Sequence, residues 1–172
     1  KLIPTENVRA LPKHFTTIAH ILTKHGYRTG SFGKWHISES PKLQGFDVAF
    51  AGNLSGHPKT YWAPYKVVDV VGKEGEYLTE RVTDEAIQFI DDSAGKPFFL
   101  YLPFFAVHDP LQGKPDLVAK YGTKPVHNGQ GRSTDYSAMI ENMDASIGRV
   151  VDKLKENGLA ENTVVIFTSD NG

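Results

Sequence analysis

The stretch that decides the fold runs from residue 26 to residue 36 and reads Gly-Tyr-Arg-Thr-Gly-Ser-Phe-Gly-Lys-Trp-His. Gly26 is suited to a left-handed cap that ends a short helix over residues 15–25. Residues 27–33 read as a strand whose small residues let a helix or a ligand come close. The strand ends in the cluster Lys34, Trp35 and His36. The sequence therefore predicts a helix that leads into a strand with polar side chains at its carboxyl end.

The same order of helix and then strand occurs twice more. Residues 79–92 place apolar side chains on one helical face and precede the apolar run 98–102, which is typical of a strand covered on both faces. Residues 136–157 have the clearest helical period and precede the β-branched run 163–168. Three such units predict an α/β fold, with a mostly parallel sheet and helices packed on its faces.

Two long segments separate these units. Residues 41–75 are rich in glycine, proline and aromatic residues and show no sustained period, which predicts a long ordered loop with room for a short hairpin. Loops of this length inside compact domains are uncommon and often functional, although the aromatic side chains could simply pin the loop to the body. Residues 111–134 are polar and glycine-rich, which predicts a second loop.

Composition limits the classes of protein to which this chain can belong. It has 172 residues, 19 Lys and Arg against 20 Asp and Glu, and 40% hydrophobic residues, which exclude a disordered tail and a basic nucleic-acid binder. The length allows one sizeable core, so we expect a single domain over residues 1–172. No apolar run approaches the roughly 20 residues that span a bilayer, so we expect no membrane contact. The absence of cysteine excludes disulfides, thiolate metal sites and a cysteine nucleophile within these residues.

Polar side chains follow all three predicted strands. They are Lys34 and His36 after the first, His108 and Asp109 after the second, and Asp170 and Asn171 after the third. In open α/β sheets, ligands bind beyond the carboxyl ends of the strands. We therefore expect these side chains to gather at one edge of the sheet.

The first two groups suit anion chemistry, and each also has an ordinary structural explanation. In an extended segment, Lys34 and His36 would project from the same face, where a cation and an imidazole suit a sulfate or phosphate group. The alternative is a solvated strand end. His108 could protonate a departing oxygen, or it could simply be hydrogen-bonded in the turn that Asp109 and Pro110 favour.

The third group suits a metal. Asp170 and Asn171 offer hard oxygen ligands on neighbouring residues, which are appropriate to calcium or magnesium, but Asp-Asn-Gly is also an ordinary turn sequence. The remaining histidines show no spacing that defines a metal site, and we interpret them as surface or structural residues. These are His14, His20, His25, His57 and His127.

Four elements, in this order, resemble the type I sulfatases of the alkaline phosphatase superfamily. They are residues 26–29, the Gly-Lys-Trp-His element at 33–36, the His-Asp-Pro element at 108–110, and the strand-like run that ends in Thr-Ser-Asp-Asn-Gly at 168–172. The resemblance covers nearly the whole chain. It implies part of an alkaline-phosphatase-like fold and hydrolysis of sulfate esters by an exported protein, whether periplasmic, extracellular or lysosomal.

The resemblance also implies roles for individual residues. Lys34 would contact the sulfate, and His36 would assist the nucleophile. His108 would contact the sulfate and is a candidate for protonating the leaving alcohol. Asp170 and Asn171 would bind calcium, with magnesium as the alternative. The implied partners are a sulfated small molecule or carbohydrate and the remainder of a sulfatase chain.

The sequence departs from the family pattern in two respects. The family nucleophile is a formylglycine made from Cys or Ser in a Cys/Ser-x-Pro-x-Arg element, and residues 1–172 contain no such element. The paired aspartates that complete the family's metal site also have no counterpart. We therefore expect an internal piece of a longer enzyme, which is inactive alone and binds metal weakly. The alternatives are a phosphate or phosphonate ester hydrolase of the same superfamily and a non-catalytic sugar-binding or structural domain.

Overall fold

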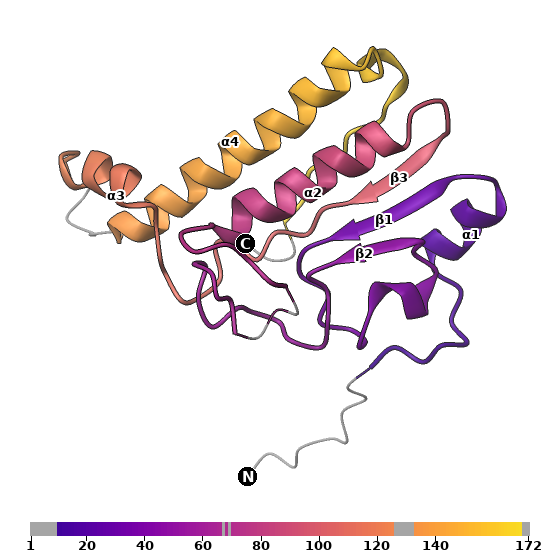
Figure 1. Ribbon diagram of the computed structural model, residues 1–172, viewed down its shortest axis with the longest axis horizontal. Helices are drawn as coiled ribbons and strands as arrows, with labels where there is room; N and C mark the ends of the chain where they lie inside the picture. Colours follow the sequence, from indigo (N-terminus) through magenta and orange to yellow (C-terminus); the bar gives the residue numbers. More distant parts are fainter. Residues whose placement is uncertain (1–9, 67, 69, 126–132, 170–172) are drawn as a thin grey trace, which may run out of the picture.

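A sheet of three parallel strands forms the centre of the protein (Figure 1). The computed structural model describes residues 10–66, 68, 70–125 and 133–169. β1 (Arg28–Phe32) lies between β2 (Val48–Phe50) and β3 (Phe98–Tyr101). Gly30 pairs with Val48 on one side and with Leu100 on the other. Because all three strands run in the same direction, their carboxyl ends meet at one edge of the sheet.

Helices cover this sheet, which confirms the α/β class expected from the sequence. The described helices are α1 (Ile18–Lys24), α2 (Leu78–Asp92), α3 (Pro115–Gly122) and α4 (Thr134–Glu156), with short 3-10 helices η1 (Pro41–Gln44) and η3 (Ala160–Asn162). Figure 1 shows α4 lying along the outer side of α2. Across the described residues, no helix is both long enough and apolar enough to cross a bilayer.

Alternation along β1 explains why helices lie on both faces of the sheet. Gly30 and Phe32 face α2: the Phe32 and Phe89 rings are 5.3 Å apart, and a Cβ at Gly30 would meet the Phe89 ring. Thr29 faces the other way, where its hydroxyl pairs with Thr23 at 3.1 Å in α1 and donates to Asp47 at 3.1 Å. One face of β1 is therefore apolar, and the other is held by buried hydrogen bonds.

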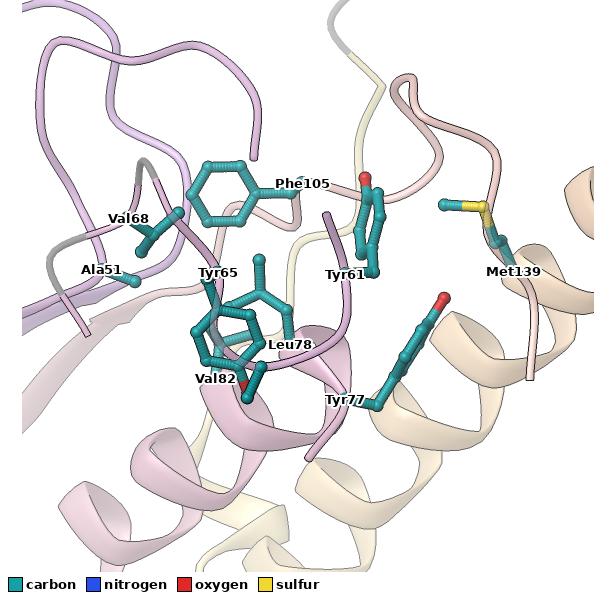
Figure 2. Close-up of a cluster of buried hydrophobic side chains, with 10 residues drawn as sticks. Ala51, Tyr61, Tyr65, Val68, Tyr77, Leu78, Val82, Phe105 and Met139 are labelled. Atoms are coloured by element: carbon teal, nitrogen blue, oxygen red, sulfur yellow. The ribbon is translucent and has the colours of Figure 1, made fainter. Parts of the chain in front are cut away.

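The long segment between β2 and α2 is pinned to the body by aromatic side chains (Figure 2). Tyr61 and Tyr65 are fully buried in a cluster with Leu78 and Val82 at the start of α2 and Met139 in α4. Each buried aromatic ring removes about 150–250 Å² from water, so the segment is held firmly although it has little regular structure. The sequence-based alternative, that these aromatics anchor the loop, is confirmed.

Acid pH should lower the stability of the packed segment between β2 and α2. Tyr65 Oη and Arg81 Nη1 both donate to Glu76 Oε1, at 2.8 and 3.0 Å. Burial favours the protonated carboxyl, but these contacts outweigh it and hold the pKa of Glu76 below its ordinary value. A carboxyl whose pKa is lower in the folded state stabilises the fold above its unfolded-state pKa, and that stabilisation disappears as pH falls through the folded-state pKa.

Urea unfolding at a series of pH values measures this effect. Glu76→Gln should flatten the acid limb of the stability curve, and Glu39→Gln, which alters an exposed carboxylate, is the matched control. An acid limb identical in the wild type and Glu76→Gln would show that this carboxyl does not contribute.

Two predicted loops contain regular structure that the sequence did not reveal. The segment 41–75 contains η1 and the three-residue strand β2, which pairs in parallel with β1 and does not form a hairpin. Its antiparallel pairing is a single bridge between Trp62 and Tyr77. The segment 111–134 contains α3, which begins with Pro115 in its first turn.

The predicted strand over residues 163–168 is wrong. These residues form no strand, and their apolar side chains face solvent, with Val164 87% and Phe167 75% exposed. A β-branched run becomes a strand only where a neighbouring strand supplies hydrogen bonds, and none of the described strands lies beside this one. The helix before it is as expected, since α4 ends at Glu156 and Gly158 adopts a φ of 67°.

Candidate functional site

The residues just after β1 are tied to β2 and to the segment that follows β3. The Gly33 N–H donates to the carbonyl oxygen of Phe50 at 3.0 Å, and the Lys34 N–H donates to that of Pro103 at 2.8 Å. Gly33 has a φ of 121°, and a Cβ at this position would overlap the carbonyl oxygen of Pro103. Only glycine permits both this backbone angle and this close approach. Lys34 is therefore placed by the packing of three strand ends.

His36 does not lie in an extended segment, so the expectation that Lys34 and His36 share one strand face is wrong. β1 ends at Phe32, and His36 adopts a φ of 64°, a left-handed conformation that is uncommon for histidine. Its N–H donates to the carbonyl oxygen of Asn53 at 2.9 Å, and its ring lies against Gly56. His36 therefore belongs to a turn that packs on the segment after β2.

His108 lies on the segment that follows β3. Its Nδ1 is 3.0 Å from the carbonyl oxygen of Asp109. Because a carbonyl oxygen can only accept, this contact assigns the Nδ1 proton to His108 and leaves Nε2 as the nitrogen that exchanges a proton. The His108 carbonyl in turn accepts from Tyr61 Oη at 3.0 Å.

Sequence reasoning missed His57, which it treated as a surface or structural residue. The His57 and His108 rings stack with centroids 5.2 Å apart and planes 12° apart. No local spacing signals this contact, because His57 follows β2 and His108 follows β3, on opposite sides of β1. For His20 and His25 the structural interpretation is confirmed, since His20 takes part in the cap of α1 and His25 Nδ1 bonds to Ile21. His127 lies outside the described residues.

Gln112 was also missed, and it fixes the segment after His108. Its Oε1 accepts from Thr60 Oγ1 at 3.0 Å and from the Tyr61 N–H at 2.8 Å, while its carbonyl oxygen accepts from Tyr77 Oη at 2.7 Å. Burial, followed by the influence of Tyr77 and Asp109, raises the pKa of Tyr61 far above its ordinary value. The Tyr61 hydroxyl therefore stays protonated and keeps donating to His108.

A hollow of about 330 Å³ opens beside His108. Its lining residues are Val107, His108, Asp109, Leu111 and Tyr136. It includes His108 but not Lys34 or His36. The contacts that the structure shows at this edge are the His36 ring against Gly56 and the stack of His57 on His108. The hollow extends from His108 toward Tyr136 near the start of α4.

The predicted metal ligands Asp170 and Asn171 lie outside the described residues. Among the residues that the structure does describe, no three His, Cys, Asp or Glu side chains are grouped so that they could hold a metal ion. The stacked rings of His57 and His108 fit this result, since parallel faces do not direct their nitrogens at one ion.

Comparisons with known proteins agree with this architecture. The sulfatase family model matches residues 3–172. A sulfatase of Formosa agariphila is 40% identical over 141 residues, covering 70% of this chain and 26% of the relative. Human N-acetylgalactosamine-6-sulfatase is 31% identical over 196 residues, covering 98% of this chain and 35% of the relative. The chain thus spans about a third or less of the length of these curated relatives.

Solved structures show the same fold. The crystal structure of Ps i-CgsB matches with a TM-score of 0.72 and 26% identity, covering 91% of this chain and 40% of that one. A crystal structure of Ps i-CgsB in complex with k-i-k-neocarrahexaose matches with a TM-score of 0.69 and 29% identity over the same shares. The family match runs through the ends of all three strands and through the loops that carry the histidines. This chain belongs to the sulfatase family.

Proposed function

We propose that this chain is a single-domain part, residues 1–172, of the catalytic region of an enzyme that hydrolyses sulfate esters. The observation that carries the proposal is the family match over nearly the whole chain, together with a lysine and three histidines on the segments that follow three parallel strands. A sulfuryl group in transfer carries negative charge on its oxygens, and cations and imidazole donors stabilise such charge.

The proposed roles follow from the chemistry of each side chain. Lys34 binds the sulfate through its ammonium group. His36 assists the nucleophile. His108 contacts the sulfate and gives a proton from Nε2 to the ester oxygen as the bond between that oxygen and sulfur breaks, so that the alcohol leaves neutral. The Nδ1 contact with Asp109 keeps the ring in the orientation that leaves Nε2 free.

The family's metal and nucleophile require groups beyond the described residues. Asp170 and Asn171 are the residues proposed to hold the metal, because carboxylate and amide oxygens suit calcium, or alternatively magnesium. Two such residues are fewer than the six to eight oxygen ligands that calcium takes, so other parts of the protein must complete the site. When present, a formylglycine supplies the nucleophile and the metal stabilises charge. Residues 1–172 contain no Cys/Ser-x-Pro-x-Arg element from which the formylglycine could be made.

The proposed substrate is a sulfated carbohydrate. Support comes from two relatives: the human relative is named for a sulfated amino sugar, and Ps i-CgsB is known in complex with k-i-k-neocarrahexaose. The proposed partner is the remainder of the sulfatase chain.

Parallel assays on nitrophenyl sulfate and nitrophenyl phosphate test the proposal. The full-length protein should hydrolyse the sulfate ester much faster than the phosphate ester, whereas residues 1–172 alone should hydrolyse neither. Calorimetric titration should likewise find tight calcium binding only in the full-length protein. A preference for phosphate would overturn the proposed reaction, and turnover by residues 1–172 alone would overturn the proposed need for the rest of the chain.

A further inference from the structure

We infer that His57 is a positioning residue for His108 and that it acts through the stack of the two imidazole rings. This inference rests on the proposed function, in which His108 protonates the leaving alcohol. The ring centroids lie 5.2 Å apart and the planes differ by 12°. The contact joins the segment after β2 to the segment after β3 and therefore reaches across the end of β1.

The backbone around His57 is held by hydrogen bonds that lead back to His36. Asn53 accepts the His36 N–H on its carbonyl oxygen at 2.9 Å and the Ser55 N–H on Oδ1 at 2.7 Å. Ser55 Oγ then donates to the carbonyl oxygen of His57 at 2.9 Å. His57 is thus placed by a short chain of hydrogen bonds that begins at His36, another proposed site residue.

The backbone on the His108 side is held by the same loop. Tyr61, four residues after His57, donates its hydroxyl to the His108 carbonyl oxygen at 3.0 Å. Gln112 Oε1 accepts the Tyr61 N–H at 2.8 Å, which ties the loop to the segment that follows His108. Both histidines are therefore fixed relative to one another by their main chains, and the stack follows from that arrangement.

The stack limits how the His108 ring can turn. With Nδ1 bonded to the Asp109 carbonyl and one face covered by His57, the ring has one favoured orientation for Nε2. A proton donor that is already oriented reacts faster than one that must first find its orientation. Removal of the covering ring should slow protonation about threefold to tenfold, the rate equivalent of one aromatic pair.

Leaving-group dependence in the full-length protein tests this role. Nitrophenolate leaves readily without a proton, whereas a sugar alkoxide needs one. His57→Ala should therefore lower kcat on a sulfated monosaccharide about threefold to tenfold, with little change in KM and little change on nitrophenyl sulfate. His57→Phe, which keeps a flat ring but no ring nitrogen, should restore most of the rate. His14→Ala, an exposed histidine outside the site, is the matched control.

Three outcomes would overturn the inference. They are an equal loss on both substrates, no loss at all, or a His57→Phe variant as slow as His57→Ala. NMR of histidine-labelled protein distinguishes failure of the positioning role of His57 from failure of the proposed function. The His108 ring protons should shift in His57→Ala and much less in His57→Phe. If the wild type hydrolyses no sulfate ester, the proposed function fails, and the presence or absence of that shift still decides whether the rings stack in solution.

Discussion

Lys34→Ala should lower kcat/KM on sulfate esters by about 10²–10³-fold, comparable to the loss of one charge-stabilising donor in other enzymes. The Lys34 backbone is fixed by the carbonyl oxygen of Pro103, and its side chain is only partly exposed. Within the described ranges, its ammonium group makes no hydrogen bond or ion pair, whereas other lysines such as Lys114 and Lys120 pair with glutamates. A lysine whose backbone is held at the end of the central strand is well placed to bind an anion.

Two further variants test whether the loss of activity is due to the charge at position 34. Lys34→Arg keeps the charge but changes its shape and reach, so it should retain part of the activity. Lys24→Ala removes an exposed lysine at the end of α1 and should leave the kinetics unchanged. The measurement is steady-state kinetics of the full-length protein on nitrophenyl sulfate. Unchanged activity in Lys34→Ala would remove Lys34 from the proposed sulfate site.

Gly33→Ala should lower the free energy of unfolding by about 2–6 kcal/mol. Two costs add at this position. The φ of 121° is a conformation that alanine rarely adopts, and the new methyl group would overlap the Pro103 carbonyl oxygen. The backbone must shift to relieve the overlap, which would disturb the hydrogen bonds that Gly33 and Lys34 make to Phe50 and Pro103.

Gly26→Ala is the matched control. Gly26 also has a positive φ, 83°, but an added Cβ there would meet no atom within 4 Å. Gly26→Ala should therefore lower the free energy of unfolding by only about 1–2 kcal/mol, which is the contribution of the left-handed conformation alone. Urea unfolding of both variants gives the difference, which isolates the contribution of the close approach. Equal losses in the two variants would show that the close approach of Gly33 to Pro103 adds nothing to stability.

The elements that the sequence predicted well are those with a local signal. The periods of α2 and α4 extend over several turns, the small residues of β1 suit a strand on which a helix packs closely, and the apolar run of β3 does form a strand. Full burial of β3 on both faces was a wrong expectation, since its side chains are only partly buried. β2 has only three residues and gives no period, so it remained hidden in a segment of glycines and aromatics. Residues 163–168 have the composition of a strand, but strand formation depends on a neighbour that composition does not specify.

For the candidate site too, the sequence predicted some features and missed others. The placement of Lys34, His36 and His108 after strands followed from the order of the elements, because parallel strands end at one edge. The conformation of His36, the stack on His57 and the hydrogen bonds of Gln112 depend on contacts between residues far apart in sequence. No pattern within one segment could have indicated them.

The central place of β1 separates two tasks of the site. The lysine proposed to grip the anion follows the middle strand, whereas the loops that carry His57 and His108 follow the strands on either flank. The residues beyond β1 are tied to those flanks at their start, where Gly33 and Lys34 donate to Phe50 and Pro103, and again at His36, which donates to Asn53. We expect insertions farther along either loop to leave the register of β1 unchanged, because Gly30 pairs with Val48 and Leu100 before either loop begins. If Lys34 binds the sulfuryl group as proposed, the loops that carry His57 and His108 can change with the alcohol while the lysine keeps its place.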